Sequence, residues 1–183
     1  MSKVPSRGFR DDEFAARLAA IQARMETHAI AALLLTTESD IFYFTGFLSQ
    51  FWQSPTRPWF VVIPASGRPI AVIPEIGVNA MASEFITDIR SWSSPCASDD
   101  GVSLLAETLL EVMAQSQSCT VGLNKGRETH IRMPLNDFES LMERLSSSES
   151  DLKIADATPH IQAVRMLKSE AEIDKIRYVA HCV

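Results

Sequence analysis

The stretch His28-Ala-Ile-Ala-Ala-Leu-Leu-Leu-Thr36 indicates the fold class of this 183-residue chain. Its continuous apolar run is typical of a strand that is covered on both faces of a sheet. Directly before it, apolar side chains recur at spacings of four, three and four residues (Phe14, Leu18, Ile21 and Met25). This spacing predicts a helix over about residues 12–27. A helix followed by a buried strand favours an α/β layer architecture.

Two further apolar runs predict a β-hairpin. Trp59-Phe-Val-Val-Ile-Pro64 and Pro69-Ile-Ala-Val-Ile-Pro74 flank the short turn Ala65-Ser-Gly-Arg68. Apolar, β-branched runs around a glycine-containing turn pair as antiparallel strands. The two strands are expected to end at Pro64 and Pro74, because proline cannot donate a hydrogen bond to a central ladder.

The second half of the chain predicts an alternation of helices and strands. The helical patterns cover 77–85, a segment from Asp99 or Asp100 to Val112, a segment from Pro134 to Leu145, and a short helix ending near Leu167. The strand patterns cover 86–92, 120–123 and 153–157. Together with the first half, this order predicts an α/β fold with a mixed β-sheet of about five to six strands and helices on both faces.

Charge and cysteine content limit the class of protein. Seventeen lysines and arginines stand against 23 acidic residues, which gives a formal net charge of −6 and argues against nucleic acid as a partner. Three widely spaced cysteines (Cys96, Cys119 and Cys182) indicate a reducing compartment rather than a disulfide framework. The longest wholly apolar run, 29–35, is shorter than the ~18–20 residues that span a bilayer. We therefore expect a cytoplasmic protein without a membrane partner.

The sequence contains no recognisable catalytic motif. Walker A, G-x-G-x-x-G, G-x-S-x-G and H-E-x-x-H patterns are all absent. The four histidines (His28, His130, His160 and His181) never pair at the i, i+3 or i, i+4 spacing of ligands on one helix face. We therefore expect no catalytic residue and no metal-ligating residue in this chain.

The loop over 46–59 is the best candidate for a functional surface. It carries aromatic residues and one arginine around two prolines (Phe47, Phe51, Trp52, Arg57 and Trp59). Aromatic residues with an arginine are frequent anchors of binding surfaces. The alternative interpretation is structural: Phe47 and Trp59 belong to the core, and Arg57 pairs with a surface carboxylate. Both interpretations stay open at this point.

The segment Lys168–Val183 predicts a helix start without a helix end. Ser169 and Glu172 have the spacing of a capping box. Apolar residues then recur on one helix face (Ile173, Ile176, Ala180 and Val183), with no stop signal after them. We expect this face to pack against a part of the protein beyond the chain.

Four segments in this order resemble the N-terminal domain of the creatinase, prolidase and aminopeptidase P family, whose C-terminal half has the pita-bread fold. They are Ala31-Ala-Leu-Leu-Leu-Thr36; Ser39-Asp-Ile-Phe-Tyr-Phe-Thr-Gly-Phe47, similar to "N-I-x-Y-x-T-G-F"; Arg57-Pro58 with the hairpin; and Val164-Arg-Met-Leu-Lys-Ser-Glu-Ala-Glu-Ile-Asp-Lys-Ile-Arg177, similar to "R-x-x-K-s-x-x-E-I-x-x-i-r". The resemblance implies ribonuclease H-like layering. It also implies an N-terminal domain over 1–163 and a junction with a first helix over 164–183, leading to a catalytic domain outside this chain.

The resemblance implies a noncatalytic domain of a cytoplasmic Xaa-Pro peptidase-like hydrolase. Such a domain makes homo-oligomer contacts, here expected in a dimer, and helps to enclose a small peptide substrate at the neighbouring subunit's active site. Arg57 looks like the substrate-facing arginine of creatinase, and Trp52 lies where related dipeptidases place a tryptophan. Two divalent metal ions, held by two Asp, one His and two Glu, are implied for the missing catalytic domain and not for this chain.

Two alternatives stay open. One is the N-terminal domain of a creatinase-type amidinohydrolase, which uses a histidine base. The other is a stand-alone protein-interaction or dimerisation module. A reading frame that continues past Val183 into the metal-ligand set would favour the peptidase, and a stop codon there would favour the module.

Overall fold

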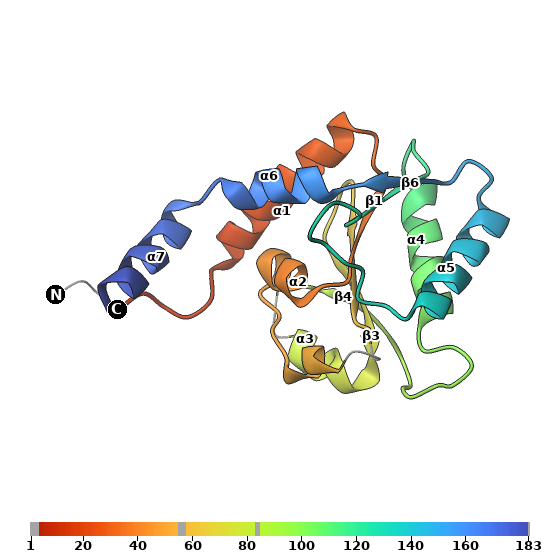
Figure 1. Ribbon diagram of the computed structural model, residues 1–183, viewed down its shortest axis with the longest axis horizontal. Coiled ribbons are helices and arrows are strands. Elements are labelled where there is room, and N and C mark those ends of the chain that lie inside the picture. Colours follow the sequence, from red (N-terminus) through yellow and green to blue (C-terminus); the bar gives the residue numbers. More distant parts are fainter. Residues whose placement is uncertain (1–3, 55–57, 83–84, 183) are drawn as a thin grey trace.

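The computed structural model describes residues 4–54, 58–82 and 85–182, and these residues contain one six-stranded mixed sheet (Figure 1). Along the sheet the strand order is β4-β3-β2-β1-β5-β6. β2 pairs antiparallel with both β1 and β3, whereas the other neighbouring strands run parallel. The predicted mixed sheet and the predicted hairpin are confirmed. The strands are β1 (Ala32–Leu35), β2 (Phe60–Pro64), β3 (Ile70–Pro74), β4 (Asp88–Trp92), β5 (Thr120–Leu123) and β6 (Lys153–Asp156).

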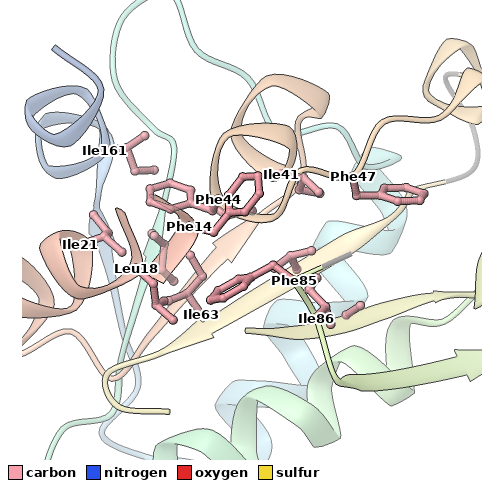
Figure 2. Close-up of a cluster of buried hydrophobic side chains, with 14 of the residues drawn as sticks. Phe14, Leu18, Ile21, Ile41, Phe44, Phe47, Ile63, Phe85, Ile86 and Ile161 are labelled. Carbon is pink, nitrogen blue, oxygen red and sulfur yellow. The ribbon is translucent and has the colours of Figure 1, made fainter. Parts of the chain in front are cut away.

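Helices cover both faces of the sheet, as the sequence predicts. On one face, α1, α2, α3 and α6 contribute to one buried cluster, part of which is shown in Figure 2. On the opposite face, α4 and α5 contribute to a second cluster. The helices are α1 (Asp11–Thr27), α2 (Glu38–Thr45), α3 (Val78–Met81), α4 (Val102–Ala114), α5 (Leu135–Ser148), α6 (Thr158–Met166) and α7 (Glu170–Cys182), with 3-10 turns η1 (Gln50–Gln53) and η2 (Glu75–Gly77).

The position of β1 in the sheet explains why its residues are all apolar and do not alternate with polar ones. Leu33 and Leu35 belong to the cluster under α1 and α2, whereas Ala32 and Leu34 belong to the cluster under α4 and α5. Successive side chains of a strand point to opposite faces, and here both faces are covered. All four residues are buried, so the strand has no solvent-facing side.

Helix α2 is the main element that the sequence analysis did not assign. Thr37 caps it by accepting a hydrogen bond from the Asp40 amide at 3.4 Å, and Gly46 ends it in the left-handed conformation with φ 82°. Ile41 and Phe44, three residues apart, point into the core. Three consecutive aromatic residues, 42–44, hide this helical spacing in the sequence.

Helix α7 begins as predicted. The Ser169 amide donates to Glu172 Oε2 at 3.0 Å, and the Glu172 amide donates to Ser169 Oγ at 3.2 Å, so the capping box is reciprocal. None of its described side chains is buried, and α7 projects away from the sheet (Figure 1). Val183 lies outside the described residues. Helix α6 is continuous across positions 163 and 164, and the domain boundary placed there stays a prediction.

Two further findings concern the protein's environment. Across residues 4–54, 58–82 and 85–182, no helix combines the length and the apolar character that a membrane span needs. Cys96, Cys119 and Cys182 are free thiols.

Candidate functional site

A crevice lies at the carboxyl ends of β1 and β5. The two strands are parallel neighbours, so their carboxyl ends share one edge of the sheet. The chain leaves β1 into α2 on one face, but after β5 it runs to α5 on the other face. In open α/β sheets, such a divergence opens a crevice where ligands commonly bind. The segment after β5 crosses this edge, where the Arg132 amide donates to Thr36 Oγ1 at 3.0 Å.

Asp40 forms a buried centre beside the crevice. Its Oδ2 accepts hydrogen bonds from Thr37 Oγ1 at 2.7 Å and from Asn124 Nδ2 at 2.6 Å. Its Oδ1 lies 2.6 Å from an Arg165 guanidinium nitrogen. These donors satisfy both oxygens of the buried carboxylate, which thereby links the elements that supply them. Asp40 therefore joins α2, the end of β5 and α6.

Arg17 forms a second buried centre, between α1 and α7. Its NH2 nitrogen lies 3.0 Å from Glu13 Oε1 and 3.4 Å from Glu172 Oε1. The NH2 group makes no hydrogen bond to the described residues, so these two contacts are ion pairs without a hydrogen bond. Its NH1 group donates to the Tyr43 carbonyl oxygen at 2.8 Å. The guanidinium also lies over the Phe9 ring at 4.2 Å. Arg17 thus holds the first turn of α7 against α1 and α2.

The aromatic residues of the 46–59 loop pack on one another. Phe47 and Trp59 stack at 5.2 Å between ring centroids, and both are buried, which confirms the structural interpretation of these two residues. Phe51 stacks on Trp59 at 5.7 Å. Trp52 is only 6% exposed and lies 6.0 Å from Trp59. Arg57, the predicted substrate-facing arginine, lies outside the described residues.

Sequence reasoning missed two residues next to Trp52. Arg132 and His130 come from a loop about 80 positions later in the chain, yet both line a cavity together with Trp52. The Arg132 guanidinium carbon lies 5.2 Å from the centroid of the Trp52 ring. Nothing in the local sequence around either residue marks them, because the contact depends on how the β5–α5 loop crosses the sheet.

Two of the histidines form a ring–ring contact that their spacing in the sequence does not predict. The His28 and His160 rings lie 4.2 Å apart, where the end of α1 meets α6. Burial, with added repulsion from His28 and Arg24, lowers the pKa of His160. Within residues 4–54, 58–82 and 85–182, no three His, Cys, Asp or Glu side chains are arranged to hold a metal ion.

Comparison with known proteins places this architecture in a family. The family model for the creatinase/prolidase N-terminal domain matches residues 17–167. The probable dipeptidase PepE of Mycobacterium tuberculosis is 26% identical over 176 residues, which is 94% of this chain and 41% of that protein. The chain therefore spans well under half the length of the curated relatives it matches.

Solved structures show the same fold. Dipeptidase PepE from Mycobacterium ulcerans aligns with a TM-score of 0.67 at 24% identity, covering 91% of this chain and 40% of that chain. A prolidase from Thermococcus sibiricus aligns with a TM-score of 0.67 at 18% identity, covering 87% and 39%. The creatinase/prolidase N-terminal domain of an X-Pro dipeptidase from Streptococcus pyogenes aligns over 81% of this chain and 98% of its own, with a TM-score of 0.55 at 16% identity.

Proposed function

Because the chain belongs to the creatinase/prolidase N-terminal domain family, we propose that it is the noncatalytic N-terminal domain of a cytoplasmic Xaa-Pro dipeptidase-like hydrolase. The observation that carries the proposal is the match of residues 17–167 to this domain, in a chain that spans 41% of a probable dipeptidase. The free thiols of its cysteines support a reducing compartment.

Catalysis in the parent protein is assigned to a separate C-terminal domain. The family resemblance implies two divalent metal ions there. The described residues of this chain do not fit such a site, since no three suitable ligand side chains converge among them. We therefore derive no chemical step from this domain.

The role proposed for the domain is contact with other parts of the assembled protein. The exposed apolar face of α7 suits the parent's own catalytic domain as its partner. Leu48 and Phe51, 61% and 41% exposed, are apolar side chains on the aromatic loop and suit a contact between subunits of a dimer. By resemblance, Arg57 would reach the neighbour's peptide substrate. Trp52, largely buried within the same loop, would form part of the wall that encloses this substrate.

The first test is catalytic. The purified 183-residue chain, assayed with Mn²⁺, Co²⁺ or Zn²⁺ on Xaa-Pro dipeptides and on creatine, should show no turnover above a metal-only blank. The longer protein that contains this chain should cleave the dipeptides. Turnover by the chain alone, or a parent that hydrolyses creatine instead, would reject the proposal.

The second test concerns the loop. In the parent, Arg57→Ala and Trp52→Phe should each lower kcat/KM about tenfold or more, which corresponds to ~1.4 kcal/mol of transition-state stabilisation. Arg144→Ala, on exposed α5 surface, is the matched control and should leave kcat/KM unchanged. A parent indifferent to both loop substitutions would remove the enclosing role and leave only the contact role.

A further inference from the structure

The N-terminal segment over residues 4–10 lies against α7, which comes from the other end of the chain (Figure 1). Lys175 of α7 donates a hydrogen bond from its ammonium group to the Ser6 carbonyl oxygen. The same ammonium nitrogen lies 4.8 Å from the centroid of the Phe9 ring, within the range of a cation–π interaction. Two contacts of one side chain therefore join the N-terminal segment to α7.

Phe9 is held in place by the rest of the domain. Its ring packs against the buried cluster under α1 and α2 and makes an edge contact with Phe14, at 6.3 Å between the ring centroids. The Arg17 guanidinium carbon lies 4.2 Å from the centroid of the Phe9 ring. Gly8, directly before Phe9, has φ 66°, a left-handed conformation that glycine adopts without strain. Phe9 therefore presents a fixed aromatic ring to Lys175.

Helix α7 depends on such contacts for its orientation, because none of its described side chains is buried. A short segment over 167–169 separates it from α6. Arg17 holds its first turn through the ion pair with Glu172 at 3.4 Å. Lys175 lies three residues after Glu172, so the two side chains share one face of the helix. Arg17 thus anchors the start of α7, and the N-terminal segment anchors its next turn.

The contact between the N-terminal segment and α7 is not a packed core. A cavity of about 610 Å³ lies between them, lined by residues of the N-terminal segment, of the first turn of α1 and of the first turns of α7. The two segments are therefore joined through the Lys175 side chain rather than along their length. A contact of this kind can open without unfolding the sheet, as low-stability elements of proteins do.

We propose that residues 4–10 form a latch that fixes the orientation of α7, and that the positive charge of Lys175 keeps this latch closed. Removal of the charge abolishes both the cation–π interaction and the charged hydrogen-bond donor. Helix α7 then turns about 167–169, while the sheet and its covering helices stay folded. On the proposed function, α7 contacts the parent's catalytic domain, so the latch sets the orientation in which the two domains meet. That consequence rests on the proposed function, whereas the latch itself does not.

The distance between two spin labels, measured by double electron–electron resonance, tests the latch. One label is attached to the exposed thiol of Cys182, at the end of α7, and the other to Ser147→Cys, at an exposed position of α5. Cys96→Ser and Cys119→Ser remove the other thiols. The protein is kept at low concentration so that the chain is monomeric. With Lys175 in place, the distance distribution should be narrow.

Variants of the latch should change this distribution. Lys175→Gln should broaden it about twofold or more, whereas Lys175→Arg, which keeps the charge, should leave it narrow. Phe9→Leu retains an apolar side chain but removes the aromatic face, so it should broaden the distribution too. Arg177→Gln is the matched control, because it removes a positive charge from an exposed position of α7 that pairs within the helix. It should leave the distribution narrow.

The stability of the sheet separates an open latch from an unfolded protein. In Lys175→Gln, Tm should stay within about 2 °C of the value for the unmodified protein, because the latch is not part of the core. An unchanged distance distribution in Lys175→Gln would overturn the proposal. Equal broadening in Arg177→Gln, or a broad distribution in the protein that retains Lys175, would overturn it as well.

Discussion

Single residues connect parts of this chain that the sequence keeps far apart. The Ser169–Glu172 capping box could be predicted because both partners lie within one helical turn. The partners of Asp40 could not, since Asn124 and Arg165 are 84 and 125 positions away. A local pattern contains no information on which distant donor meets a buried carboxylate. The same limit explains why Arg132 was missed beside Trp52, although Trp52 itself was selected from its aromatic loop.

Arg17→Ala should strongly destabilise the protein. The side chain is 5% exposed, forms ion pairs with Glu13 and Glu172, and donates a hydrogen bond to the Tyr43 carbonyl oxygen. Removing one partner of a buried ion pair leaves the other charges uncompensated, at a cost of about 3 kcal/mol. Urea denaturation of the variant should show this loss. Arg10→Ala is the control: its ion pair with Asp12 is largely exposed, so the loss should stay within about 0.5 kcal/mol. Equal losses in the two variants would contradict the role of burial.

His160 should make stability depend on pH. Burial and the neighbouring His28 and Arg24 lower its pKa in the folded state, against a weaker opposite effect of Asp156. The unfolded chain then binds the proton more readily. The stability that the neutral ring contributes is thus present above the ordinary histidine pKa of about 6.5, and is lost as pH falls through the lower folded-state pKa.

In His160→Gln, Tm should therefore fall less than in the unmodified protein between about pH 7.5 and about pH 5.5. His181→Gln is the control, because His181 is exposed near the end of α7. It should retain the pH dependence of the unmodified protein. If Tm of His160→Gln depends on pH as strongly as Tm of the unmodified protein, the His28–His160 contact is not the source of the pH dependence.

At the scale of elements, the sequence predicted the helices and strands in which apolar residues follow a single clear periodicity. β2 and β3 are β-branched runs joined by a short turn, and α1 has a single apolar stripe. Helix α2 was not predicted, because its exposed Phe42 and its buried Phe44 are both aromatic and hide the helical periodicity. Which aromatic ring faces the core depends on the strands underneath. The signals that could have identified α2 are the capping residue Thr37 and the terminal Gly46.

The cap of α7 provides a prediction at this scale. Ser169→Ala removes the acceptor of the Glu172 amide, and the loss of such a cap costs about 1 kcal/mol. Because α7 buries none of its described side chains, the cost should appear as local fraying. Amide exchange should accelerate in the first turns of α7 and stay unchanged in β1 and β2. Ser147→Ala, an exposed serine within α5, should leave exchange in α7 unchanged. Acceleration throughout the protein would mean that α7 folds cooperatively with the sheet.

At the scale of the whole molecule, the layers follow from the order of elements but the sheet order does not. β1 and β5 are adjacent although three strands lie between them in the sequence. Hairpin neighbours are set by a short turn, whereas this pairing is set by helices that must cover both faces. The crevice at the carboxyl ends of these strands depends on that pairing. The sequence therefore predicted the architecture without predicting the place of the cavity.

The surface of the whole molecule is uneven in its apolar content. Met166 and Leu167, 75% and 80% exposed, precede α7, and Ile176 and Val179, 55% and 60% exposed, lie on it. Exposed apolar groups concentrated in one region drive association when nothing covers them. On the proposed function, the parent's catalytic domain covers this region. The 183-residue chain by itself should therefore self-associate as its concentration rises.

The double variant Ile176→Glu, Val179→Lys should suppress this association. The two positions are three apart on one helix, so the new charges support the helix while they remove the apolar groups. Tm should change little, because neither side chain is buried in the protein. Sedimentation equilibrium should show a mass that rises with concentration for the unmodified chain and stays monomeric for the variant. Leu135→Lys, at an exposed position of α5 on the other side of the sheet, should associate like the unmodified chain. An unmodified chain that remains monomeric at every concentration would show that the α7 region does not drive association.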